Sequence, residues 1–236
     1  MKFKNKVVVV TGGAHGIGQA IVEDFRKEGA VVEVIDKTPG DYYVGDLSNK
    51  ETLEAFGSYV LEKHGHIDYL INNALPIMKG IDECSYEEFQ YALSVGVTAP
   101  FYLTKLFKDS FNKDAVIINI SSSRDRMSQA NTESYTAAKG GIAALTHALM
   151  MSLRGRVRVN SISPGWIDTR GHTYTGPDAY QHPSGRVGNP YDISSMVLFL
   201  CSTKASFING ENICIDGGMT KQMIYHQDYG WYLDDK

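Results

Sequence analysis

A glycine-rich turn near the start of the chain joins a short β-branched segment to an amphipathic one. Glycines stand at positions 12, 13, 16 and 18, and apolar residues at 17, 21 and 25 have the spacing of one helical face. Glycines let the backbone approach a pyrophosphate, whose charge the N–H groups and dipole of a helix N-terminus stabilise. Asp36 ends the next predicted strand, eighteen residues after Gly18, where a carboxylate can accept hydrogen bonds from ribose hydroxyls. The order of these features predicts a dinucleotide-binding α/β fold.

Strand-like and helix-like segments alternate along the rest of the sequence. The expected strands are short and apolar on both faces, as strands buried in a parallel sheet are, and no linker rich in Pro, Gly or Ser divides the chain. We therefore predict a single doubly wound Rossmann-type α/β domain over residues 1–236, with a parallel sheet of about seven strands and helices on both faces. Strands are expected at 6–11, 31–35, 67–71, 115–120, 157–161 and 213–215, and helices at 16–29, 53–61, 85–111, 132–153 and from 190 onward.

The second crossover of this sheet is unusually short. Nine residues separate Asp36 from Asp46, and they include Pro39-Gly40, whereas a parallel crossover normally needs about a dozen residues and a helix. We expect a tight loop followed by a short third strand, around Tyr42–Val44, at the edge of the sheet.

Charge and composition argue against several other classes of protein. The formal net charge of −4 is unfavourable for binding nucleic acid or an anionic membrane surface, and no apolar run approaches the roughly 18 residues of a membrane span. The basic start of the chain lacks the apolar core of a signal peptide. Three widely spaced cysteines predict free thiols in a reducing compartment. We expect a cytoplasmic protein without a metal site.

A tyrosine and a lysine four residues apart carry the expected chemistry. Tyr135 and Lys139 share one face of the helix predicted over 132–153. Because a neighbouring ammonium favours the phenolate, we expect Lys139 to lower the pKa of Tyr135, which suits a general acid–base. Ser122 follows the strand expected at 115–120, at the end of the sheet where ligands bind in open α/β folds. Its hydroxyl can then reach the same substrate oxygen as Tyr135.

Further motifs follow in a characteristic order. Together they are Thr11-Gly12 with Gly16-Ile17-Gly18, Asp46-Leu47, Asn72-Asn73-Ala74, Ser122, Tyr135 with Lys139, Asn160, Pro164-Gly165-Trp166-Ile167 with Thr169, Gly188 and Pro190 with Asp192-Ile193, and Asp216-Gly217-Gly218. In this order they resemble the short-chain dehydrogenase/reductase (SDR) superfamily over nearly the whole chain. The resemblance implies hydride transfer between a nicotinamide cofactor and a carbonyl or secondary alcohol. Tyr135 would be the general acid–base, Ser122 would hydrogen-bond the substrate oxygen, and Lys139 would hold the nicotinamide ribose.

The resemblance also implies how the cofactor is held. Asp36 would bind the adenine ribose, Asp46 with Leu47 would flank the adenine, and Ile167 and Thr169 would contact the nicotinamide carboxamide. Because the Asp36 carboxylate would repel a 2′-phosphate, NAD is favoured over NADP, whereas Lys37 or His15 could favour a phosphate. The residues expected around the cofactor are Gly12, His15, Gly16, Ile17, Gly18, Asp36, Asp46, Leu47, Asn73, Ala74, Tyr135, Lys139, Pro164, Gly165, Ile167 and Thr169.

Two positions depart from the superfamily pattern. Leu75-Pro76 stands where a glycine usually follows Asn-Asn-Ala, and because a residue before proline avoids the helical region, we expect a reshaped loop beside the nicotinamide ribose. In the run 95–99, Gly96 replaces the fourth catalytic residue, an asparagine that holds a kink whose carbonyl orders a proton-relay water. Gly96 keeps a carbonyl and bends easily, so we expect a working enzyme with a modified proton supply.

The remaining expectations concern substrate and assembly. The loop 166–189 should cover the substrate, and its polar side chains, with Arg124 and Arg126, suggest a small carbonyl or alcohol that is polar or anionic; alternatively they are solvated loop residues. The aromatic tail 219–236 should pack over the pocket mouth or onto a neighbouring subunit of a homodimer or homotetramer. A non-redox reaction on the same scaffold, and a catalytically lapsed nucleotide-binding protein, are the alternatives to a dehydrogenase.

Overall fold

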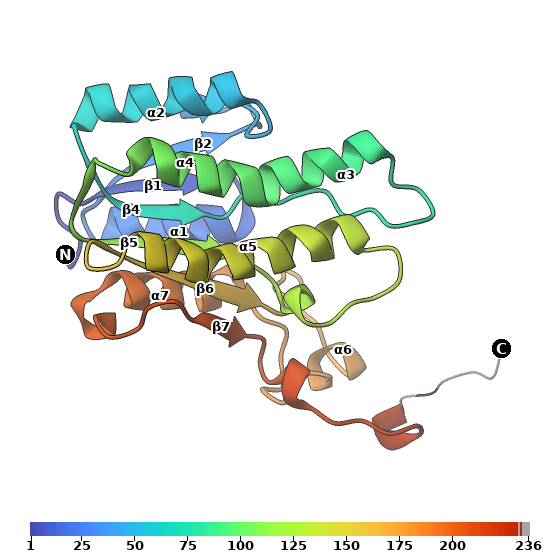
Figure 1. Ribbon diagram of the computed structural model, residues 1–236. Helices are drawn as coiled ribbons and strands as arrows, with labels where there is room; N and C mark the ends of the chain where they lie inside the picture. Colours follow the sequence, from blue (N-terminus) through green and yellow to red (C-terminus); the bar gives the residue numbers. More distant parts are fainter. Residues whose placement is uncertain (231, 233–236) are drawn as a thin grey trace.

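Buried segments rich in valine and isoleucine form one parallel sheet (Figure 1). The computed structural model describes residues 1–230 and 232. The sheet has seven strands in the order β3-β2-β1-β4-β5-β6-β7, and every neighbouring pair is parallel. The predicted fold class is therefore confirmed. The strands are β1 (Val7–Thr11), β2 (Val31–Asp36), β3 (Tyr43–Val44), β4 (Ile67–Asn72), β5 (Phe111–Ile120), β6 (Val157–Pro164) and β7 (Asn212–Ile215).

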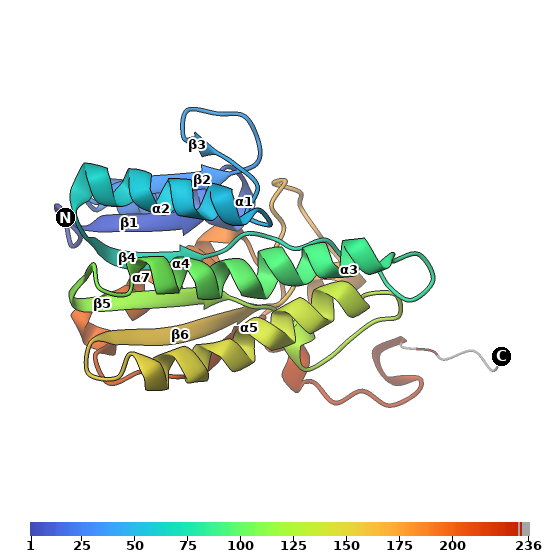
Figure 2. The same ribbon diagram turned by 45° about the horizontal axis from the view of Figure 1, so that its top comes forward.

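Helices cover both faces of the sheet. Helices α1 (Gly16–Lys27) and α7 (Pro190–Cys201) pack on one face, while α2 (Lys50–His64), α4 (Ala99–Phe107) and α5 (Glu133–Ser152) cover the other (Figures 1 and 2). Successive strand side chains point to opposite faces, so Val8 and Val10 of β1 enter the core under α1 and α7, whereas Val7 and Val9 enter the other core. Among the described residues, no helix combines the length and apolarity needed to cross a bilayer.

The short second crossover has the predicted form. No helix joins β2 to β3, and the two residues of β3 pair in parallel with Ile35 and Asp36 at the edge of the sheet. The Tyr42 hydroxyl donates a hydrogen bond of 2.8 Å to the Thr38 carbonyl. A Cβ at Gly40 would lie 2.3 Å from the Tyr42 ring, so the absence of a side chain at Gly40 lets this ring fold back over the loop.

The prediction of one continuous helix over 85–111 is wrong. The segment contains α3 (Tyr86–Leu93), a π-helical turn (Ser94–Thr98) and α4, and Phe111 already begins β5. A π-turn inserts one residue into the helix, and a segment of five residues is too short for apolar spacing to distinguish it from an α-helical turn. The loop 166–189 likewise contains a short helix, α6 (Pro177–Tyr180), which the sequence analysis did not predict.

Candidate active site

The carboxyl ends of the strands border a cleft of about 510 Å³, a volume typical of small-molecule sites. It lies beside the point where the strand order changes direction, between β1 and β4. The structure brings all the predicted cofactor and catalytic residues to this cleft: Gly12, His15, Gly16, Ile17, Gly18, Asp36, Asp46, Leu47, Asn73, Ala74, Ser122, Tyr135, Lys139, Pro164, Gly165, Ile167 and Thr169. The cleft is also lined by Leu75, from the loop expected beside the nicotinamide ribose, and by residues that no motif marks: Ile35, Gly45, Tyr91, Val95, Ile120 and Ser121.

The glycine loop is held in place by close packing. Gly12 has φ +65°, a left-handed conformation that favours glycine. A Cβ at Gly18 would lie 2.0 Å from the Gly12 carbonyl oxygen, so α1 can approach the loop this closely only without a side chain there. The Asn73 amide donates hydrogen bonds to the carbonyls of Gly12 (2.8 Å) and Thr11 (3.2 Å). Asn73 therefore borders the cleft, and its amide group also fixes the glycine loop.

The N-terminus of α1 lacks the side-chain cap that three other helices have. Side chains of Asn49, Ser85 and Asn189 cap α2, α3 and α7. At the start of α1, His15 makes no such hydrogen bond, and the first turn contains no acidic residue. The first-turn N–H groups and the positive end of the helix dipole are thus available to an anion in the cleft. This arrangement fits the pyrophosphate of a dinucleotide.

Two carboxylates at the adenosine end of the cleft are fixed by hydrogen bonds. The oxygens of Asp36 accept from the backbone N–H groups of Ala14 (3.1 Å) and Thr38 (3.0 Å), and each oxygen retains capacity for a further donor such as a ribose hydroxyl.

Asp46 is held by one local and one distant partner. Its carboxylate accepts hydrogen bonds from Ser48 N–H (2.8 Å) and from the Tyr91 hydroxyl (3.1 Å). Burial acts to raise the pKa of Asp46, but the hydrogen bonds outweigh burial and hold this pKa below its usual value. Tyr91 was missed because a contact between residues 45 positions apart leaves no local signal in the sequence.

The electrostatics of Tyr135 differ from the prediction. Burial raises the pKa of Tyr135 above its usual value, and a hydrogen bond with Ser122 and the charge of Arg124 oppose this effect without cancelling it. The expected lowering by Lys139 is therefore wrong for the cofactor-free chain. The reason is the position of the Lys139 ammonium, which lies 5.5 Å from the centre of the Tyr135 ring and donates a hydrogen bond of 2.7 Å to the Ile120 carbonyl.

Lys139 is itself strongly perturbed. The residue is buried, and loss of solvation lowers its pKa from 10.5 to about 7. Its backbone carbonyl accepts a hydrogen bond of 2.8 Å from Ser121, which joins α5 to the end of β5. Its ammonium has three N–H donors, and one of them bonds a carbonyl among the described residues, so the others can bind hydroxyl oxygens in the cleft.

The perturbed lysine gives the cofactor-free protein a specific pH dependence. Because the folded-state pKa of Lys139 is depressed, the unfolded chain binds the proton more readily, so the fold is destabilised increasingly as the pH falls from 10.5 to about 7. We expect the difference in unfolding free energy between Lys139→Met and wild type to shift in favour of Met across this range and to level off below pH 7. Urea titrations from pH 6 to 9.5 measure it, with the exposed Lys4→Met as control. A pH-independent difference would contradict the prediction.

Comparisons with known proteins agree with this geometry. A family model described as "Enoyl-(Acyl carrier protein) reductase" matches residues 12–220. An uncharacterised oxidoreductase of Thermotoga maritima is 39% identical, over 95% of this chain and all of the relative. L-fucose dehydrogenase of Mus musculus is 34% identical, over 92% of this chain and 89% of the relative. The solved structure of an apo SCOR enzyme from Clostridium thermocellum has a TM-score of 0.91 and 46% identity, covering 98% of this chain and 99% of that one.

The chain belongs to the short-chain dehydrogenase/reductase superfamily. This confirms the resemblance noted in the sequence, and it makes the protein an oxidoreductase of a family that uses nicotinamide cofactors.

The two segments that depart from the SDR pattern, at Pro76 and Gly96, pack against each other in the structure. A Cβ at Gly96, in the π-helical turn, would lie 2.7 Å from the Cβ of Ala138 and 3.4 Å from Cγ of Pro76. Ala138 and the proline ring therefore occupy the space that a side chain at position 96 needs. The glycine and the proline, which are 20 positions apart in the sequence, form one packing unit beside the helix that carries Tyr135 and Lys139.

The histidines near residue 65 lie at the opposite end of the sheet from the cleft. His64 Nε2 lies 2.7 Å from Glu33 Oε1, and His66 Nε2 lies 3.8 Å from Asp68 Oδ2. The two rings thus face different carboxylates. Throughout the part of the chain that the structure describes, no three His, Cys, Asp or Glu side chains are grouped as metal ligands.

Proposed function

We propose that this SDR protein interconverts a secondary alcohol and a carbonyl compound, with NAD as its preferred cofactor. The observation that carries the proposal is that Ser122, Tyr135 and Lys139 line the same cleft as the uncapped N-terminus of α1. A bound nicotinamide would supply or accept the hydride. The phosphates would be held by the glycine loop and the first turn of α1, and the adenine ribose by Asp36.

The protein side chains handle the proton and the substrate oxygen. The raised pKa of Tyr135 keeps its phenol protonated at neutral pH, so that it can donate a proton to a carbonyl oxygen. Ser122 would donate a hydrogen bond to the same oxygen as negative charge develops on it. Lys139, on the next turn of α5, would hold the nicotinamide ribose. In alcohol oxidation the same phenol, deprotonated, would take the hydroxyl proton.

The direct test is an absorbance screen for reduced nicotinamide. Hydroxy acids, sugars, polyols and steroids are incubated with the protein and NAD, and in parallel with NADP. We expect turnover in at least one class, and the L-fucose dehydrogenase relative supports including sugars. Binding of NAD without turnover of any class would favour the catalytically lapsed alternative, and an isomerised or dehydrated product without net cofactor reduction would favour a non-redox reaction.

Cofactor preference is expected to depend on Asp36. The carboxylate is fixed by Ala14 N–H and Thr38 N–H at the end of β2, where it would repel a 2′-phosphate, while the neighbouring Lys37 also lines the cleft. Replacing Asp36 with Ser should lower the ratio of kcat/KM for NAD to that for NADP by at least about 10-fold, since one like-charge repulsion is removed. Steady-state kinetics with both cofactors measure the ratio. An unchanged ratio would show that Asp36 does not set the preference.

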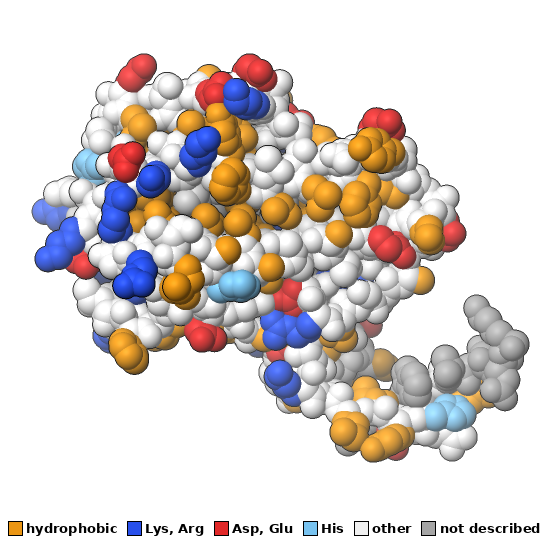
Figure 3. Space-filling model, viewed as in Figure 1, with side chains coloured by type: hydrophobic (Ala, Val, Ile, Leu, Met, Phe, Trp, Pro, Cys, Tyr) orange, Lys and Arg blue, Asp and Glu red, His pale blue; other side chains and the backbone are white. Residues whose placement is uncertain are grey.

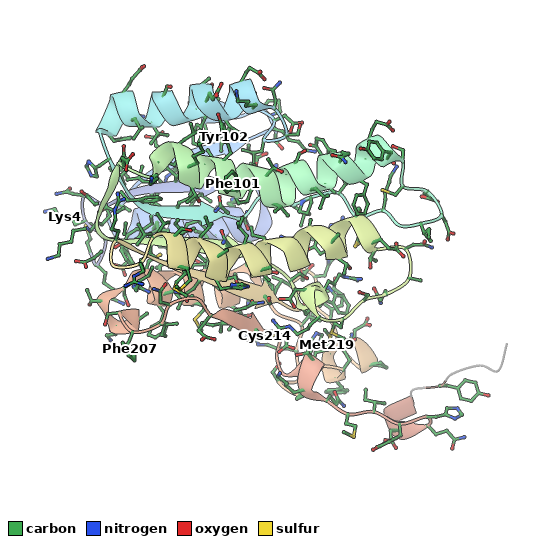
Figure 4. All side chains as sticks on the ribbon, viewed as in Figure 1. Lys4, Phe101, Tyr102, Phe207, Cys214 and Met219 are labelled. Atoms are coloured by element: carbon green, nitrogen blue, oxygen red, sulfur yellow. The ribbon has the colours of Figure 1, made fainter. Side chains whose placement is uncertain are left out.

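We infer that the chain assembles as a homodimer or homotetramer through its C-terminal segment and the α3–α4 face. In both views residues 222–230 project away from the body, and no described residue beyond Thr169 lines the cleft (Figures 1 and 2). Hydrophobic side chains gather over α3 and α4 and on the projecting segment (Figure 3); exposed examples are Tyr86, Phe101, Met223 and Tyr225. Figure 4 labels Phe101 on α4 and Met219 at the start of the tail.

The tail therefore has a measurable role to test. The tail was expected either over the pocket mouth of its own chain or on a neighbouring subunit. Residues 219–230 do not line the cleft, so the first of these positions is not seen. Tyr229, Trp231 and residues 233–236 lie outside the side chains that the structure describes. Deleting residues 220–236 should dissociate the oligomer or raise the KM for the substrate, because apolar tail residues would lose a neighbouring subunit. Light scattering and kinetics measure both effects, and a truncated protein with unchanged mass and KM would refute the assignment.

We also infer a cytoplasmic location. Cys84, Cys201 and Cys214 are free thiols in the structure, which suits a reducing compartment. Fractionation of the source cells, with the protein detected by antibody, would test this.

A further inference from the structure

Arg124 lies directly beside the proposed catalytic pair. Its backbone N–H donates a hydrogen bond of 3.2 Å to the Ser122 hydroxyl, in the short 3₁₀ turn that follows β5. Its positive charge acts on the Tyr135 phenol, whose pKa it lowers against the effect of burial. Arg124 is thus fixed at its backbone by one member of the pair, and its side chain lies within electrostatic reach of the other.

Among the residues that the structure describes, the guanidinium of Arg124 has no counter-ion. One of its nitrogens, Nη2, donates to the neutral side-chain oxygen of Gln129. The other, Nη1, is buried and has no hydrogen-bond partner among the described residues. Within the described chain, no carboxylate forms an ion pair with this guanidinium.

The neighbouring Arg126, in the same turn, has its guanidinium paired with a carboxylate. Its Nε and Nη2 donate to the two oxygens of Asp125, at 2.6 and 3.0 Å. Asp125 also accepts hydrogen bonds from Ser163 and Asn212. The acidic residue of the turn is therefore committed to Arg126, so it does not neutralise Arg124.

A buried guanidinium donor without an acceptor costs free energy, and a carboxylate is the partner that best matches its charge and fork geometry. We propose that Arg124 binds a carboxylate of the substrate, and that the substrate is a hydroxy acid or the corresponding oxo acid. This proposal rests on the proposed function. During oxidation the carbinol carbon would lose a hydride to the nicotinamide and the hydroxyl would lose its proton to the deprotonated Tyr135, while the carboxylate bound by Arg124 would be unchanged.

The first test compares substrates that differ in the carboxylate. Hydroxy acids and sugar acids are assayed against neutral alcohols and polyols of the same carbon skeleton, with wild type, Arg124→Met and Arg124→Lys. Any effect of Arg124→Met on the pKa of Tyr135 is shared by all substrates, so we expect kcat/KM for the acids to fall about 10- to 100-fold more than kcat/KM for the neutral compounds, as for loss of a charged hydrogen bond. Arg124→Lys should be intermediate. Arg154→Met, at an exposed arginine in the turn before β6, is the matched control.

A binding measurement separates this proposal from the proposed function. Malonate, a carboxylate without an oxidisable hydroxyl, is titrated calorimetrically into the NAD-saturated proteins. Wild type and Arg154→Met should bind it, and Arg124→Met should not. Equal binding by all three, or a wild type that oxidises neutral alcohols better than acids, overturns the assignment of Arg124 and leaves the dehydrogenase function standing. Malonate binding that depends on Arg124, in a protein that oxidises no alcohol, retains the carboxylate site and overturns the proposed function.

Discussion

Tyr135→Phe is expected to lower kcat by about 10²- to 10⁴-fold and to leave the affinity for NAD nearly unchanged. The substitution removes one hydroxyl, the group that exchanges a proton with the substrate oxygen, and keeps the ring that packs in the cleft wall. Steady-state kinetics measure kcat, and fluorescence titration with NADH measures binding. The pairing of lost turnover with retained binding distinguishes a chemical role of the phenol from a structural one.

A matched tyrosine outside the cleft provides the control for this experiment. Tyr102 on α4 donates a hydrogen bond of 2.6 Å to Glu54 on α2, and Figure 4 labels it beside these two helices. Tyr102→Phe removes the same atom, and we expect it to keep wild-type kcat. If Tyr135→Phe retained turnover, the proposed mechanism would be contradicted, whatever the control shows.

Gly96→Asn, which restores the residue usual in the superfamily, is expected to destabilise the protein by about 2–4 kcal/mol. The new Cβ would lie 2.7 Å from the Cβ of the buried Ala138, and the amide would enter a space bounded by the Pro76 ring. Overpacking and an unsatisfied buried polar group each cost about 1–3 kcal/mol. Thermal and urea unfolding measure the loss, and the pH profile of kcat shows whether the proton supply changes as well.

The steric clash between residues 96 and 138 in Gly96→Asn should be relieved by a second substitution. Removing the opposing methyl group with Ala138→Gly should restore part of the stability of Gly96→Asn, although the glycine itself costs about 1 kcal/mol in a helix. A double-mutant cycle therefore should show favourable coupling between the two positions. Independent, additive effects, or a Gly96→Asn protein as stable as wild type with an unchanged rate and pH profile, would show that the position is not constrained in this way.

The fold was predictable because its signals are local or periodic. Runs of buried β-branched residues mark the strands, four-residue spacing marks α1, and the nine residues between Asp36 and Asp46 are too few for a helix. These patterns predict the strand stub β3 as well as the long elements. The π-helical turn at 94–98 was missed because five residues are too few to show a period that differs from that of the flanking α-helices.

The sequence predicted which residues line the candidate site better than it predicted their pKa values. The proposed residues line one cleft because motifs at the carboxyl ends of parallel strands must converge there. The pKa of Tyr135 was predicted in the wrong direction because it depends on burial and on where the Lys139 ammonium points, and helix spacing specifies neither. The contact of Pro76 with Gly96 was invisible for a similar reason, since neither residue type signals a partner.

The very short strand β3 has a consequence for how copies of this chain can meet. A sheet edge with unpaired backbone groups can recruit a strand from another molecule, and proteins limit this with short edge strands and inward-pointing charges. Both devices are present at this edge, because β3 has two residues and the buried Glu33 of β2 pairs with Lys63 at 2.9 Å. Strand addition and edge-to-edge aggregation are therefore disfavoured at β3. The longer edge strand β7 is the edge at which a strand of another molecule can pair.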